Sequence, residues 1–165
     1  MEDKKSAFPV GLAHIRESNL IEGFDDPDVD KAAMEAWRRL KARLKRRPIT
    51  HDDIQQLNAE LTAHQPELND MWRGAYRSRN RARVWIGGRE GLNPAQVARA
   101  MDDWLERFYT ADPIPHHVEF EHIHPFIDGN GRTGRMLMWL MQQNRGERPT
   151  LIYKSKVQDY YSWFE

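Results

Sequence analysis

Apolar residues recur at helical spacing along most of this chain, and this periodicity constrains its fold more than any other feature. The longest stripe comprises Val29, Ala33, Trp37, Leu40 and Leu44. Asp28 is the predicted N-cap of this helix, and Pro48 predicts its end. Thr50 then precedes a second stripe, and Asp53 three residues later completes a sequence resembling a capping box. The first third of the chain is therefore expected to be helical.

The remaining periodicity predicts four more helices. Asn93-Pro94 opens one, a second covers about 116–123, a third covers about 132–143, and the last starts near Val157. The short β-prone run that ends at Ile86 precedes two glycines and predicts a hairpin within about 74–90. The predicted fold class is mainly α with one small β-hairpin flap.

Composition excludes several classes of protein. The 165 residues suit one domain, with 1–165 taken as a single unit. The absence of cysteine excludes disulfides, thiolate metal sites and a cysteine nucleophile. No apolar run approaches the ~20 residues of a membrane span, and the N-terminus lacks the apolar stretch of a signal peptide, which predicts a cytoplasmic protein without a membrane partner.

The 25 basic and 25 acidic residues balance, so net charge does not favour nucleic-acid binding. Their distribution is uneven. Acidic residues gather between residues 16 and 30, seven basic residues lie within 38–47, and six arginines lie within 73–89. The 38–47 run is interpreted as a solvated helix face. The flap arginines are interpreted as neighbours of a phosphate-binding site.

The segment 124–135 carries the chemistry. Its two glycines flank an asparagine just before a helix, and such a turn offers successive N–H groups to an anion at the positive end of the helix dipole. Arg132 and Arg135 lie near one face of that helix and can both reach phosphate oxygens. Asp128 is a hard oxygen ligand for magnesium, and His124 is a base that titrates near neutrality. Together these groups indicate transfer of part of a nucleotide, although a Gly-Asn-Gly turn alone also serves simply to cap helices.

The segment resembles, position by position, the signature of the Fic family, His-Pro-Phe-x-(Asp/Glu)-Gly-Asn-Gly-Arg-x-x-Arg. The resemblance covers essentially the whole chain, with a flap at about 74–90 and the catalytic motif at 124–135. It implies a protein adenylyltransferase, an enzyme that moves AMP from ATP to a hydroxyl of a Ser, Thr or Tyr side chain. The target would be another protein or the enzyme itself, and the sequence leaves open whether the protein is a homo-oligomer.

The resemblance also assigns roles to residues. His124 would be the general base, and Asp128 would hold Mg²⁺, or alternatively Mn²⁺. The nucleotide would contact the rest of the motif, the flap and a tyrosine pair: Gly129, Asn130, Gly131, Arg132, Thr133, Arg135, Val84, Trp85, Ile86, Gly87, Tyr160 and Tyr161. The two tyrosines suit an ordinary core role equally well.

A second pattern lies near the N-terminus. Ser18 and Glu22 match the Ser/Thr-x-x-x-Glu-Gly/Asn pattern of the family's inhibitory helix, here expected over about 10–24, in the arrangement called class II. By resemblance, Glu22 would pair with Arg135 and prevent it from binding the γ-phosphate of ATP. The structural alternative is an amphipathic helix for which Gly23 is only the C-terminal cap.

Other functions remain open at this point. The same scaffold could remove AMP from a modified protein, or transfer another nucleotide-derived group such as phosphate. It could also serve as a non-catalytic nucleotide-binding regulatory module, although such a module would not need the base His124. The sequence gives no pointer to the identity of the target.

Overall fold

The computed structural model describes residues 8–78, 85–86 and 89–165. The described chain is mainly helical, as predicted. Its α-helices are α1 (Leu12–Ile21), α2 (Pro27–Leu44), α3 (His51–Thr62), α4 (Val97–Glu106), α5 (Pro113–Ile123), α6 (Asn130–Asn144) and α7 (Val157–Tyr161). Short 3₁₀ helices are η1 (Asp70–Trp72), η2 (Pro94–Gln96), η3 (Lys154–Lys156) and η4 (Ser162–Phe164).

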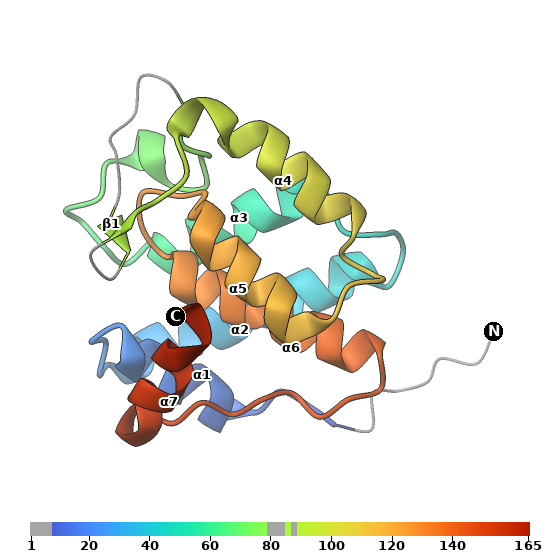
Figure 1. Ribbon diagram of the computed structural model, residues 1–165. Coiled ribbons are helices and arrows are strands. Elements are labelled where there is room, and N and C mark those ends of the chain that lie inside the picture. The colour runs from blue at the N-terminus through green and yellow to red at the C-terminus, as the bar shows by residue number, and fades with distance from the viewer. Residues whose placement is uncertain (1–7, 79–84, 87–88) are drawn as a thin grey trace.

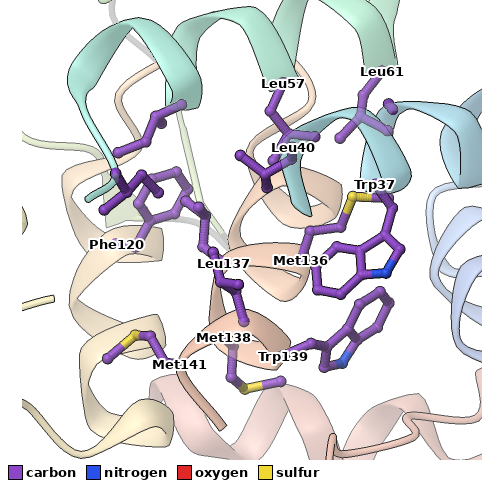
Figure 2. Packing of buried hydrophobic residues seen from close by; sticks show 14 of the residues in the cluster. Trp37, Leu40, Leu57, Leu61, Phe120, Met136, Leu137, Met138, Trp139 and Met141 are labelled. Carbon is purple, nitrogen blue, oxygen red and sulfur yellow. The ribbon is translucent and has the colours of Figure 1, made fainter. Parts of the chain in front are cut away.

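Helix α6 forms the centre of the fold, with α1, α3 and α5 packed around it (Figure 1). All residues from Arg132 to Gln143 are buried, including the polar residues at both ends of this stretch. Figure 2 shows Trp139 near Trp37 of α2, and their rings meet edge to face at 6.4 Å between centroids. On another side of α6, Leu137 lies toward Phe120 of α5. This packing fixes α5 against α6, and residues 124–129 form the turn that connects the two helices.

Two helices begin at capped residues. Thr50 and Asp53 form a capping box, as predicted, with the Thr50 amide donating to Asp53 Oδ2 at 3.0 Å. The N-cap of α2 was predicted wrongly, because Asp26 caps this helix and accepts a hydrogen bond from the Asp28 amide at 2.8 Å. Pro27 explains the difference, since its fixed φ and missing N–H suit the first helical position.

Other boundaries shift by a few residues. Helix α5 begins at Pro113 and α6 at Asn130, both earlier than predicted, while Asn93-Pro94 opens a 3₁₀ turn ahead of α4.

The predicted hairpin appears as two antiparallel two-residue strands, β1 (Trp85–Ile86) and β2 (Arg89–Glu90), with Trp85 opposite Glu90. The predicted flap residues Val84 and Gly87 lie outside the described residues. Within the described part of the chain, none of the helices has the length and apolar character needed to cross a membrane.

Candidate active site

His124 ends α5 in a left-handed conformation, with φ 50° and ψ 62°. This backbone turns the chain sharply into the 124–135 segment and costs roughly 1 kcal/mol for a residue other than glycine. The ring Nδ1 lies 3.3 Å from the carbonyl oxygen of Glu121. Because a carbonyl can only accept, Nδ1 carries the proton and Nε2 keeps its lone pair. Burial lowers the pKa of His124 to about 4, so the ring is neutral at pH 7 and Nε2 can act as a base.

Arg77 supports this turn from behind. Its Nε donates to the carbonyl of His124 at 2.6 Å, and its Nη2 donates to the carbonyls of Ile123 and Leu92, each at 2.9 Å. Arg73 likewise donates to main-chain carbonyls, including that of Thr62. The guanidinium groups of these two flap arginines hold loops together, and Arg77 does so directly beside His124. That the flap arginines neighbour a phosphate-binding site stays a prediction.

The turn from Asp128 to Gly131 requires its glycines. Gly129 has φ +75°, and a Cβ there would lie 2.7 Å from the Thr62 side chain and 2.8 Å from the Asn58 side chain. A Cβ on Gly131 would overlap the Glu22 carboxylate. The N-terminus of α6 is thus open for close approach by an oxygen-rich group, and a carboxylate from the α1 end lies there.

The polar side chains of the motif mostly brace the turn. The Asn130 amide bonds both the N–H and the carbonyl of Phe126, each at 2.9 Å, so its side chain fixes the loop and leaves its main chain to face an anion. Thr133 is fully buried, and its hydroxyl accepts from Asn58 Nδ2 at 3.3 Å. The predicted contact of Thr133 with a nucleotide stays a prediction.

Arg135 is buried and has three partners. Its Nη2 donates to Glu22 Oε1 at 2.7 Å and to the Ser18 carbonyl at 3.0 Å, and its Nε donates to Ser18 Oγ at 2.8 Å. Its Nη1 donates to the Tyr160 hydroxyl at 3.3 Å. Both residues of the predicted inhibitory pattern therefore contact the arginine that the resemblance assigned to the γ-phosphate. Gly23 has φ +86° and terminates α1, as the structural alternative expected. This capping role and the contact of Glu22 with Arg135 are therefore both present.

Tyr160 is almost fully buried and also lines the cavity described below. Only 3% of it is exposed, and its hydroxyl lies 2.8 Å from His117 Nε2. Since Arg135 can only donate to this oxygen, the hydroxyl proton points to His117. Burial, assisted by the charge of Arg135, lowers the pKa of His117 to about 3, which keeps Nε2 an acceptor. Tyr161 is more exposed, at 42%, and lines the cavity.

A cavity of about 790 Å³ opens over these groups. Its lining includes Glu22, Glu121, His124, Gly131, Arg135 and Tyr161. The volume lies within the range of nucleotide and drug-sized sites. The structure therefore brings the predicted base, the helix N-terminus and the Glu22–Arg135 pair to one hollow.

Asp128 and Arg132 meet through a residue that sequence reasoning missed. Gln65 Nε2 donates to Asp128 Oδ2 at 2.7 Å, and Arg132 Nη2 donates to Gln65 Oε1 at 2.9 Å. Arg132 also lies over the Phe24 ring at 4.5 Å, and burial lowers its pKa to about 10. No local pattern marks Gln65, because it follows α3 and lies 63 residues before Asp128.

Glu121 is a second missed residue. It is buried beside the cavity, and burial raises the pKa of its carboxyl to about 8, although Arg135 lies near enough to oppose this. Its Oε1 has no hydrogen-bond partner among the described residues. The sequence does offer a signal for this residue, because a glutamate stands about one helical turn before His124.

The described residues contain no cluster of three or more His, Cys, Asp or Glu side chains placed to hold a metal ion. Asp128 remains the one carboxylate on the turn. A single carboxylate suits Mg²⁺ when phosphate oxygens and waters supply the other ligands, as is usual for magnesium at nucleotide sites.

Comparison with known proteins gives consistent results. A sequence model of the Fic/DOC family matches residues 48–142. The chain is 33% identical over 126 residues to "Protein adenylyltransferase Fic" of Drosophila willistoni, which covers 71% of this chain and 24% of that protein, and 32% identical to the Drosophila grimshawi protein of the same name, with 71% and 25% covered. The chain thus spans about a quarter of the length of these curated relatives.

Solved structures resemble the fold over most of the chain. A Fic domain-containing signaling protein from Bacteroides thetaiotaomicron superimposes with a TM-score of 0.70 at 22% identity, covering 92% of this chain and 69% of that one. Fic-1 from C. elegans gives the same TM-score and identity, with 92% and 53% covered. The family match covers more than half of the sequence and includes the whole 124–135 motif, so the chain belongs to the Fic/DOC family.

Proposed function

We propose that this protein is an adenylyltransferase that moves AMP from ATP to a hydroxyl side chain of a protein target. The observation that carries the proposal is one cavity lined by His124, with its free Nε2, and by Arg135 at the N-terminal half of α6. The names of the curated relatives support the same chemistry. The enzyme itself is one candidate for the protein that receives AMP.

In the reaction, His124 Nε2 takes the proton of the acceptor hydroxyl as its oxygen attacks the α-phosphorus. The bond between the α-phosphorus and the bridging oxygen breaks, and pyrophosphate leaves. The N–H groups of the Gly129–Gly131 turn and the α6 dipole would stabilise charge on the phosphate oxygens. Arg132 and Arg135 would position the phosphates, and positioning supplies most of the catalysis in phosphoryl-type transfer.

Asp128 fits the role of the protein ligand for Mg²⁺, or for Mn²⁺ in its place. A bound divalent cation would neutralise charge on the phosphates and align them for attack. The Asp128 carboxylate is held by the Gly129 amide at 2.6 Å and by Gln65, which leaves lone pairs on both oxygens for a cation.

We further propose that the protein is held inactive in the class II arrangement, with α1 as the inhibitory helix. The 2.7 Å contact of Glu22 with Arg135 supports this, because an arginine held by a carboxylate cannot also bind the γ-phosphate. The position of Glu22 over Gly131 adds a negative charge where phosphates would lie. ATP would then bind with its α-phosphate misaligned for attack.

Removal of AMP from a modified protein is the second candidate. Glu22 and His124 line the same cavity, so a water held by the Glu22 carboxylate could attack the phosphorus of a phosphodiester placed there. The bond from phosphorus to the side-chain oxygen would break, which releases AMP and restores the hydroxyl. A cytoplasmic location, predicted from the sequence, stays a prediction.

Intact-mass spectrometry of the Glu22→Gly variant incubated with ATP and Mg²⁺ tests the proposal. A gain near ~329 Da identifies AMP transfer and a gain near ~80 Da identifies phosphate transfer, the groups that an ATP-dependent transferase can donate. Incubation in a cell lysate extends the test to foreign targets. No gain on the variant or on any lysate protein would favour a nucleotide-binding module without catalysis.

A further inference from the structure

Gln65 connects the two charged residues of the motif that do not contact each other. Its amide nitrogen donates to Asp128 at 2.7 Å, and its amide oxygen accepts from Arg132 at 2.9 Å. Only 5% of Gln65 is exposed, and its bond to Arg132 is buried, whereas its bond to the exposed Asp128 lies at the edge of the site. The orientation of the amide is unambiguous, because a carboxylate can only accept and a guanidinium can only donate.

The position of Gln65 is fixed by its main chain. Its N–H donates to the Thr62 carbonyl at 3.0 Å at the end of α3, and its own carbonyl accepts from Arg73 Nη2. Pro66 follows and restricts the backbone conformation of Gln65. The side chain therefore reaches the motif from a rigid support.

An amide is well suited to this place. A glutamate at residue 65 would accept from Arg132 but repel Asp128, and a lysine would do the reverse. Glutamine supplies a donor and an acceptor without charge, so it satisfies both neighbours and neutralises neither.

Without this amide, the two charged residues would be expected to pair. Asp128 and Arg132 are four residues apart, and the charge of Asp128 acts on Arg132. Arg132 is buried and Asp128 is exposed, and a guanidinium and a carboxylate this close form a charge-assisted, often bidentate pair when nothing lies between them. Such a pair would occupy the carboxylate that a cation needs and the N–H groups that a phosphate needs.

Arg132 keeps unused donors in the present arrangement. Its Nε and Nη1 are buried and have no hydrogen-bond partner among the described residues. Phe24 covers one face of the Arg132 guanidinium. This contact fixes the orientation of the group and leaves its N–H donors available to an anion.

We propose that Gln65 is a positioning residue that acts as a neutral spacer, keeping Asp128 free for a divalent cation and Arg132 free for phosphate oxygens. The benefit of this role rests on the proposed function. The separation of the Asp128 and Arg132 charges, in contrast, is a property of the folded chain alone. The substitution Gln65→Met keeps the length of the side chain and removes both hydrogen bonds. Gln56→Met, on the exposed face of α3, is the matched control.

The first test is a crystal structure of the Gln65→Met variant without nucleotide. We expect Arg132 and Asp128 to form an ion pair with N···O within 4.0 Å, the ordinary limit for such a contact. An Arg132 that stays apart from Asp128 in the folded variant would overturn the spacer role. This outcome does not depend on whether the protein transfers AMP.

The second test measures binding of Mn²⁺, by electron paramagnetic resonance, to the Glu22→Gly protein with an α,β-methylene analogue of ATP. Gln65→Met should weaken Mn²⁺ binding at least five-fold, and Gln56→Met should change it less than two-fold. When Arg132 is already replaced by methionine, the same Gln65 substitution should have less than a two-fold effect, because the competing cation is gone. An equal effect in both backgrounds, or none in the first, would overturn the inference. Loss of AMP transfer from all variants, with the ion pair still formed in the crystal, would instead count against the proposed function.

Discussion

Arg77 Nε donates to the main-chain carbonyl of His124 at 2.6 Å, across 47 residues of sequence. This bond holds the left-handed turn that presents the imidazole to the cavity. Arg77→Met would leave the carbonyls of His124, Ile123 and Leu92 without this donor in a buried place. We expect the free energy of unfolding to fall by about 2–4 kcal/mol, measured by urea denaturation, and AMP transfer to fall with it.

The exposed Arg99 on α4 supplies the control for this prediction. Arg99→Met removes the same charge and should change the unfolding free energy by less than about 0.5 kcal/mol. If Arg77→Met were no more destabilising than Arg99→Met, the supporting role of Arg77 would be wrong.

The Tyr160 hydroxyl accepts from Arg135 and donates to His117. Tyr160→Phe leaves His117 Nε2 buried without its donor. The variant should lose about 1–2 kcal/mol of unfolding free energy. Tyr153→Phe, at a tyrosine that is 49% exposed, should lose almost none. Equal stability of the two variants in thermal denaturation would contradict the network.

Burial of Glu121 makes stability depend on pH. Its pKa in the folded protein is raised to about 8 from 4.5, so the folded state binds more protons than the unfolded state between these values. The contribution of this group to stability is therefore present at low pH and is lost as the pH rises toward 8. Glu121→Gln should raise the melting temperature more at pH 8.5 than at pH 5, by about 3 °C or more. The same increment at both pH values would show that the carboxyl does not titrate in this range.

His124 should titrate well below neutrality, because burial lowers its pKa to about 4. The Cε1–H signal of its imidazole in NMR spectra should stay constant between pH 5.5 and 8. In this range the ring is neutral, so the base is available throughout. The linked stability has the opposite sign to that of Glu121, since the unfolded state binds the proton first and stability falls as the pH drops below about 6.5. A titration midpoint near 6.5 for the His124 signal would contradict this account.

Local signals in the sequence predicted local structure well. The Thr50–Asp53 capping box and the turn before α6 form as expected, because each depends on residues a few positions apart. The predicted N-cap at Asp28 was wrong by two residues, since Pro27 takes the first helical position and leaves Asp26 as the cap. The resemblance also led to the Glu22–Arg135 contact, over 113 residues, through a pattern of known spacing.

The residues that position the site could not be predicted in the same way. Arg77 and Gln65 act through hydrogen bonds to residues 47 and 67 positions away, and neither belongs to a pattern with that spacing. The sequence around Arg77 is misleading, because an arginine in a basic run suggests a contact with phosphate. Only the packing of α3 and α5 against α6 reveals that its donors face carbonyls.

If Glu22 holds Arg135 away from ATP, the Glu22→Gly variant releases this arginine. A matched control is Glu147→Gly, which removes a carboxylate paired with the exposed Arg145 at 2.6 Å, outside the cavity. His124→Ala added to Glu22→Gly removes the base.

The measurement is the rate at which AMP, a mass gain near ~329 Da, accumulates on the protein with ATP and Mg²⁺. We predict a rate at least ten-fold above the parent for Glu22→Gly, which corresponds to ~1.4 kcal/mol, the parent rate for Glu147→Gly, and no transfer once His124→Ala is added. A folded Glu22→Gly protein that accumulates AMP no faster than the parent would contradict the account.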